Sequence, residues 1–147
     1  MRSKLTHPRN FLPLLAALCL LLLCTTGVSA QSSTPDPVAS LRSAKLIYVK
    51  SSSVLVGTSV IEEKLQQRAE FSQMSLVITR DPNAADLILE VHHDVLTKYV
   101  YTAVDPRSNI VVASGKLSSL GGTVAGKVAK RFLKEVMKAR ATTPAKK

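Results

Sequence analysis

Three consecutive residues, His92, His93 and Asp94, carry the side chains in this sequence best suited to bind a metal ion or to move a proton. They end a run that alternates apolar and polar residues, as a half-buried strand does, so neighbouring side chains point to opposite faces. His92 and Asp94 therefore share a face with Glu90, while His93 points the other way. Zinc sites need three or four protein ligands, usually from separated elements. We predict no metal site here, with His92 in solvent and His93 at the edge of the core.

The other familiar catalytic patterns are incomplete. Ser51–Ser53 lie in an expected loop, but the chain has no Gly-x-Ser-x-Gly turn to present a nucleophile. Glu62 and Glu63 fall in the first turn of an expected helix, where carboxylates interact favourably with the helix dipole. Gly57–Ser59 precede that helix without the lysine and spacing of a phosphate-binding loop. We expect no catalytic residue, no cofactor and no enzyme activity; a hydrolase or metal-binding protein built on the histidine cluster is the least favoured alternative.

One group of charged residues does have regular spacing. Five basic residues recur at helical intervals near the end of the chain: Lys127, Lys130, Arg131, Lys134 and Lys138. The opposite side of the same helix is apolar and consists of Val124, Ala125, Val128, Ala129, Phe132, Leu133, Val136 and Met137. Burying these eight side chains contributes on the order of 10–20 kcal/mol gross. We therefore expect the helix to cover a sheet, which leaves the five basic side chains as a basic ridge open to anionic partners.

Strands and helices must position these residues, and the hydrophobic pattern indicates where they lie. Strands are expected over residues 44–50, 75–79, 87–95, 99–104 and 110–117. A helix is expected over residues 59–71, begun by a capping box of Ser59 and Glu62, and a second helix follows Thr123. The order β-α-β-β-β-β-α predicts an α+β fold, with a mainly antiparallel sheet and two helices packed on one face.

Two details sharpen the sheet prediction. The strand over 87–95 directs Leu87, Leu89, Val91 and Val95 to one face, which we expect to be the buried one. The last two strands form a hairpin around residues 105–109, where Asn109 tolerates the left-handed conformation that rejoins the strands. An exposed edge of this hairpin could pair with a second copy, so a homo-dimer stays open.

The first thirty residues predict export. Met1–Asn10 are basic and contain no acid, residues 11–24 are apolar except for Pro13, and Val28–Ala30 offer small residues for cleavage. This is the pattern of a signal peptide over residues 1–30. About 20 apolar residues are needed to cross a bilayer, so a membrane anchor is disfavoured. We expect a periplasmic or extracellular protein after cleavage near Ala30.

Removal of the signal peptide also removes both cysteines, Cys19 and Cys24. A lipid anchor on either is disfavoured because a leucine precedes each one. The remaining chain has no cysteine for a disulfide or a thiolate metal site. We expect a flexible linker over residues 31–43, a single α+β domain over residues 44–140 and a disordered tail over residues 141–147.

The exported part of the chain is basic. The sequence has 20 basic and 10 acidic residues, and Arg2, Lys4 and Arg9 leave with the signal peptide, so the net charge is +7. Such a charge favours anionic partners. Nucleic acid is an unexpected partner, because the protein is exported and its few aromatic residues do not alternate with a basic stripe as stacking platforms do.

Several short motifs fall at corresponding places of a known group of proteins. They are Ala85-Asp86 before a hydrophobic strand, Val104-Asp105 at the hairpin, and Ser114-Gly115-Lys116 before an alanine-rich helix. In these motifs and in the order of its elements, the chain resembles small bacterial envelope domains, namely the amino-terminal domain of the Tol translocation protein TolB and the penicillin-binding-protein activator lipoproteins. The resemblance implies an α+β envelope domain that binds other proteins and catalyses nothing. No functional residue is transferred from it.

The sequence therefore favours an exported, non-enzymatic domain that binds an envelope protein or an anionic cell-wall component, with the basic ridge as one contact. A peripheral membrane-surface protein is the alternative, in which the basic terminal helix lies on anionic lipid. That contact is less favoured, because the same apolar stripe is needed to cover the sheet.

Overall fold

The computed structural model describes residues 36–119 and 123–142, which fall within one compact unit. The expected signal peptide and the last residues of the expected tail lie outside these ranges. A single mixed sheet forms the centre of the fold, in the order β2-β1-β3-β4-β5. Its strands are β1 (Leu46–Ser51), β2 (Val77–Ile78), β3 (Leu87–His93), β4 (Lys98–Asp105) and β5 (Ile110–Ser118). The predicted α+β class and the predicted succession of five strands along the chain are confirmed.

The sheet is antiparallel on one side and parallel on the other. The long strands β3, β4 and β5 pair antiparallel, as the hairpin pattern predicts. β1 lies between β2 and β3 and is parallel to both. Parallel neighbours need a crossover connection, and α3 (Thr58–Gln66) and α4 (Ala69–Gln73) supply it between β1 and β2. Because β1 and β3 are parallel, their carboxyl ends lie at the same end of the sheet.

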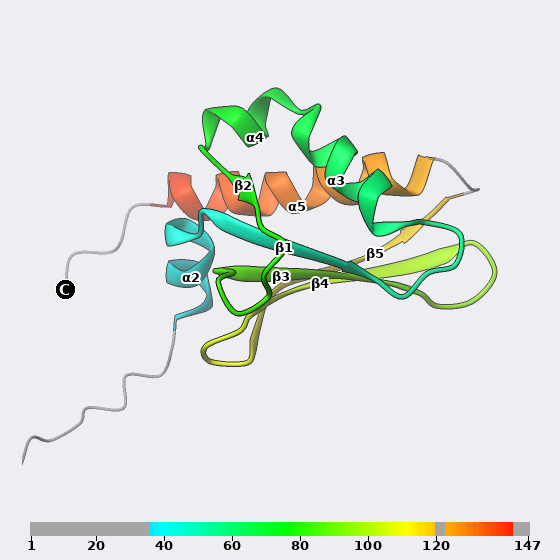
Figure 1. Cartoon of the computed structure of the whole chain (residues 1–147), viewed down its shortest axis with the longest axis horizontal. Helices are drawn as coiled ribbons and strands as arrows, with labels where there is room; N and C mark the ends of the chain where they lie inside the picture. Colours follow the sequence, from blue (N-terminus) through cyan, green and yellow to red (C-terminus); the bar gives the residue numbers. More distant parts are fainter. Residues whose placement is uncertain (1–35, 120–122, 143–147) are drawn as a thin grey trace, which may run out of the picture. The chain divides into compact units, whose positions relative to one another are not determined.

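The core lies between the sheet and the helices α3 and α5 (Val124–Ala141), which occupy the same side of it (Figure 1). The sheet contributes alternate residues to this core, including Ile47, Val49, Leu87, Leu89, Val91, Tyr99, Tyr101 and Leu117. α5 contributes all of its predicted apolar stripe except Met137, which is exposed. Ala139 is buried one turn further along. The expectation that helices cover one face of the sheet is consistent with this arrangement.

The helix expected over residues 59–71 is two helices. Arg68 adopts an extended conformation (φ −87°, ψ 131°) and separates α3 from α4. In a continuous helix Phe71 would point about 120° away from Leu65, and the break brings both side chains into the core. The predicted capping box is also wrong. The helix begins one residue earlier, with Gly57 at the cap and no side-chain hydrogen bond there. Glu62 is buried and pairs with Arg80 (Nη2 to Oε2, 2.9 Å).

The linker expected over residues 31–43 is wrong for its second half, because residues 37–43 form helix α2 (Pro37–Ser43). The Asp36 carboxylate accepts a hydrogen bond from the Val38 amide at 2.9 Å, and proline begins the helix. Leu41 is buried in the same core as α5. An Asp-Pro pair is common in turns as well as at helix starts, so these two residues do not by themselves predict a helix. The burial of Leu41 favours the helix over a turn.

One further correction concerns the end of β3. The strand stops at His93, and Val95, which the alternation directs to the core, is exposed in the loop that follows. Asn109 does adopt the left-handed conformation expected at the hairpin, with φ 56°. Among the helices in the described ranges, none combines the length and the apolar character of a membrane span.

Candidate functional site: a basic face at the edge strand β5

α5 presents its five predicted basic residues on one side. Lys127, Lys130, Arg131, Lys134 and Lys138 are all exposed. At 100° per residue their side chains fall within a sector of about 100°, opposite the buried stripe. The basic ridge expected from the sequence is therefore placed in solvent, because the apolar side of α5 is the part that covers the sheet.

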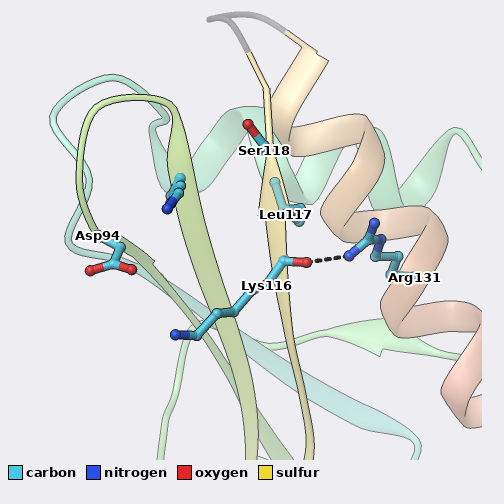
Figure 2. Close-up of a pocket in the computed structure, with 6 residues that line it drawn as sticks. Asp94, Lys116, Leu117, Ser118 and Arg131 are labelled. Carbon is cyan, nitrogen blue, oxygen red and sulfur yellow. Dashed lines mark hydrogen bonds between the residues drawn. The ribbon is translucent and has the colours of Figure 1, made fainter.

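The basic ridge also contacts the edge of the sheet. The Lys127 ammonium donates a hydrogen bond to the Ser118 carbonyl at 3.2 Å, and the Arg131 guanidinium donates to the Lys116 carbonyl (Figure 2). β5 is an edge strand, so these carbonyls have no strand partner. The two contacts cap part of an edge that could otherwise pair with another chain. They also fix Arg131 beside β5.

Beyond Arg131 the basic surface continues into a cleft of about 300 Å³. The described residues that line it are Asp94, Lys98, Lys116, Leu117, Ser118 and Arg131. Figure 2 shows the Lys116 side chain pointing away from Arg131, toward the side on which Asp94 lies. The residues that line the cleft therefore include basic groups on both sides of β5.

Sequence reasoning missed Lys98 and Lys116. Their neighbours Tyr99 and Leu117 are buried and opposite each other in the β4–β5 register, so the two lysines point to the other face of the sheet. Lys98 pairs with Ser118, which makes Lys116 its diagonal neighbour. Part of the signal was present in the predicted hairpin: Lys116 lies in a predicted strand and Lys98 directly precedes the other one, and both alternate with buried residues. We refer to the five ridge residues with Lys98 and Lys116 as the basic face.

The positive charge of the basic face is not neutralised by ion pairs. In the described ranges the ion pairs join Lys50 to Glu90, Lys64 to Glu63, Arg80 to Glu62, His92 to Glu90 and Arg107 to Asp86. None of these pairs includes a residue of the basic face. Every aspartate and glutamate of the sequence falls inside the described ranges. The seven cations therefore lack an acidic side-chain partner within the chain.

Tyr101 is a buried residue of β4 that lies opposite Gly115 of β5 and adjoins the basic face. Burial raises the pKa of its hydroxyl, Glu135 raises that pKa further and Arg131 opposes both effects, so the net shift is upward. The ring packs against Gly115 of β5, where an added Cβ would lie 2.6 Å from Tyr101 Cε1. Gly115 thus leaves room for the ring between β5 and α5.

The histidine cluster is divided by the structure. His92 lies 3.5 Å from Glu90 through Nε2 and 2.7 Å from the Ser52 hydroxyl through Nδ1. The His93 ring packs on Tyr99, with 4.8 Å between ring centroids, while Asp94 lines the cleft. Across the described residues, no three His, Cys, Asp or Glu side chains converge as a metal site would require.

A second polar cluster lies at the other end of the sheet. The Asp86 carboxylate accepts hydrogen bonds from the Lys45 and Leu46 amides (2.9 and 3.0 Å) and pairs with Arg107 at 2.9 Å. Burial raises the pKa of Asp86, but these hydrogen bonds and Arg107 outweigh burial and leave the pKa below its usual value. These contacts fasten the start of β1 to the hairpin turn.

Asp105 completes this cluster. Its carboxylate accepts a hydrogen bond from the Ser40 hydroxyl of α2 at 2.8 Å. Burial raises the pKa of Asp105, but hydrogen bonds from the Ser40 hydroxyl and the Arg107 amide help to lower it below its usual value. Because each charged group here is already engaged within the fold, we assign the cluster a structural role.

Comparisons of the chain with protein-family models, curated proteins and solved structures find no match.

Proposed function

We propose that this chain is an exported, non-enzymatic domain that holds an anionic partner, either an acidic envelope protein or a cell-wall polymer, against the basic face. The observation that carries the proposal is the absence, within the described ranges, of an ion pair for any of the seven cations. Unpaired positive charge gathered around the β5 edge, from α5 on one side and from Lys98 and Lys116 on the other face of the sheet, attracts anions over the Debye length, about 8 Å at physiological ionic strength. The resemblance to small envelope domains agrees with this role and is itself part of the proposal.

Export can be tested separately. We propose that residues 1–30 are removed, so the mature chain begins at Gln31. Amino-terminal sequencing of the protein recovered from cell envelopes would give Gln31 as the first residue. Recovery of a chain that starts at Met1 would contradict export by a cleaved signal.

Binding is best tested on the part of the basic ridge that makes no internal contact. In the described structure, the side chains of Lys130, Lys134 and Lys138 donate no hydrogen bond, so replacing them with glutamine removes charge and leaves the fold contacts intact. Poly(glycerol phosphate) and poly-L-glutamate serve as probes for a cell-wall polymer and for an acidic protein. We expect affinity for at least one probe to fall about tenfold and to lose much of its salt dependence.

The matched control is Lys45→Gln, Lys50→Gln and Lys64→Gln, which changes the net charge equally on other surfaces. Lys50 and Lys64 form ion pairs at 3.5 Å, and Lys64 also donates a hydrogen bond to the Gln67 side chain at 2.9 Å. These contacts are exposed, so their loss costs little stability. We expect this control to bind both probes almost as tightly as the wild type. An equal loss in both triple variants would show that overall charge, and not the basic face, determines binding.

A further inference from the structure

Two loops at one end of the sheet expose apolar side chains to water. Val54 and Leu55 of the β1–α3 loop are 101% and 65% exposed, and Val95 and Leu96 of the β3–β4 loop are 57% and 83% exposed. The loops leave the same edge because β1 and β3 are adjacent and parallel (Figure 1). Ser52 joins their bases, through its amide to the Val91 carbonyl at 3.0 Å and its hydroxyl to His92. We call Val54, Leu55, Val95 and Leu96 the apolar tip.

Both loops hold these side chains outward. In the first loop, the Ser51 hydroxyl donates to the Val56 carbonyl at 2.6 Å, and the Leu55 amide donates to the Ser53 hydroxyl at 3.2 Å. Ser53 and Val56 are buried, so the loop is anchored on both sides of the exposed pair. These contacts hold the backbone of the loop in the conformation that exposes Val54 and Leu55.

The second loop is held in an unusual conformation. Leu96 has φ 54°, which is uncommon for a residue with a branched side chain. The Lys98 amide donates to the Val95 carbonyl at 2.9 Å, and the His93 ring contacts the Leu96 carbonyl. The turn thus maintains a strained leucine at its outermost point, where it gains no packing within the chain.

Charge at this end of the sheet complements an anionic surface. Lys98 follows the second loop directly, and Lys116 and Arg131 line the cleft beside it. Asp94 is the acidic member of the described lining residues. Apolar side chains flanked by cations are the arrangement by which proteins insert into the headgroup region of a bilayer.

We propose that this end of the sheet docks on a bilayer that contains anionic phospholipid, with the apolar tip inserted among the headgroups and Lys98, Lys116 and Arg131 facing the phosphates. A bilayer fits better than a protein partner, because the apolar side chains project from two loops and a soft surface needs no matching pockets. The contact differs from the less favoured membrane alternative considered from the sequence, in which α5 would lie on lipid, since the apolar side of α5 is buried against the sheet. The proposed lipid contact shares Arg131 with the basic ridge but does not require the ridge to bind a polyanion.

The chain contains no tryptophan, so a single introduced tryptophan reports its own environment. We expect the emission of Val54→Trp and of Leu96→Trp to shift to the blue with phosphatidylglycerol-containing vesicles, and brominated lipid to quench it. Val77→Trp and Val111→Trp are the controls, because both valines are 53% exposed but lie away from the tip. No shift at positions 54 and 96, or an equal shift at the control positions, would overturn the proposal.

Vesicle co-sedimentation measures the contribution of the tip. We expect Leu55→Ser with Leu96→Ser to weaken binding about tenfold or more, and Val77→Ser with Val111→Ser to leave it unchanged. The tip variant should still bind poly(glycerol phosphate), so loss of lipid binding and loss of polyanion binding are separable. Unchanged sedimentation of the tip variant would show that vesicles adsorb through charge alone, which would overturn insertion.

Discussion

The two ends of the sheet use charge in opposite ways. At the end where α2 packs, hydrogen bonds and an ion pair connect Asp86, Asp105 and Arg107 with one another and with α2. We call this end of the sheet the paired end. At the end where β1 and β3 finish, Lys98 and Lys116 face a cleft without an ion-pair partner in the described chain. Internal partners stabilise a fold, whereas unpaired charge beside exposed apolar residues is available for a partner.

The basic residues at the carboxyl end of α5 show the same division. Arg140, near its carboxyl end, donates to the Met74 and Ala44 carbonyls at 2.6 and 2.7 Å and so joins three segments of the chain. Lys134 and Lys138 lie in solvent on the opposite side of the helix. One helix therefore stabilises the paired end through one side and forms the basic ridge with the other.

The largest effect is expected from Asp86→Ala at the paired end. The substitution leaves the Lys45 and Leu46 amides and the Arg107 guanidinium without their acceptor. Hydrogen bonds to charged groups contribute about 1.5–3 kcal/mol, so we expect the free energy of unfolding to fall by about 2–3 kcal/mol. Urea denaturation followed by circular dichroism measures this change. A loss below about 0.5 kcal/mol would contradict the division between the two ends.

The pH dependence of the same variant sharpens this test. Asp86 and Asp105 have folded-state pKa values below their usual value, so their stabilisation is present above a pH of about 4 and is lost as the pH falls through the folded pKa. The free energy by which wild type exceeds Asp86→Ala should therefore shrink as the pH falls below about 4. A difference that stayed constant into strong acid would mean that the carboxylate charge contributes little.

A smaller effect is expected from Gly115→Ala, which acts on the boundary between the core and the basic face. The new methyl would lie 2.6 Å from Tyr101 Cε1, so the ring or β5 must move. Overpacking of this kind costs about 1–3 kcal/mol, and we expect the midpoint of thermal unfolding to fall accordingly. The double variant Gly115→Ala with Tyr101→Leu removes the clash, and the two substitutions should then cost less than the sum of their separate effects. If the two substitutions lowered the stability by strictly additive amounts, the Tyr101 ring would not be what excludes a side chain at position 115.

The sequence predicted the parts of this molecule that local periodicity determines. The apolar stripe of α5, the inward residues Leu87, Leu89 and Val91, and the left-handed Asn109 follow from spacing and residue type. Helix α2 was missed because its formation depends on Leu41 finding a buried place beside α5, which is a long-range contact. The break at Arg68 likewise depends on the burial of Phe71.

The candidate site shows the same limit. Helical spacing predicts the basic ridge, but Lys98 and Lys116 join it only because β5 is the edge strand beside α5. Strand order is a property of the whole sheet and cannot be read from spacing within one segment. The apolar tip was also missed, because the placement of Val54 and Leu96 at the same end of the sheet depends on the parallel pairing of β1 with β3.

The smallest effect on stability is expected at the basic ridge itself. Replacing Lys130, Lys134 and Lys138 with glutamine removes like charges spaced three or four residues apart, whose mutual repulsion opposes helix formation, and it disrupts no contact in the described structure. The free energy of unfolding should therefore stay within about 0.5 kcal/mol of the wild-type value or rise slightly. Urea denaturation at low salt, where repulsion is strongest, gives the most sensitive measurement. If the free energy of unfolding fell by more than about 1 kcal/mol, these lysines would contribute to the stability of the fold, as the charged residues of the paired end do. They could then no longer be treated as a surface that is free for binding.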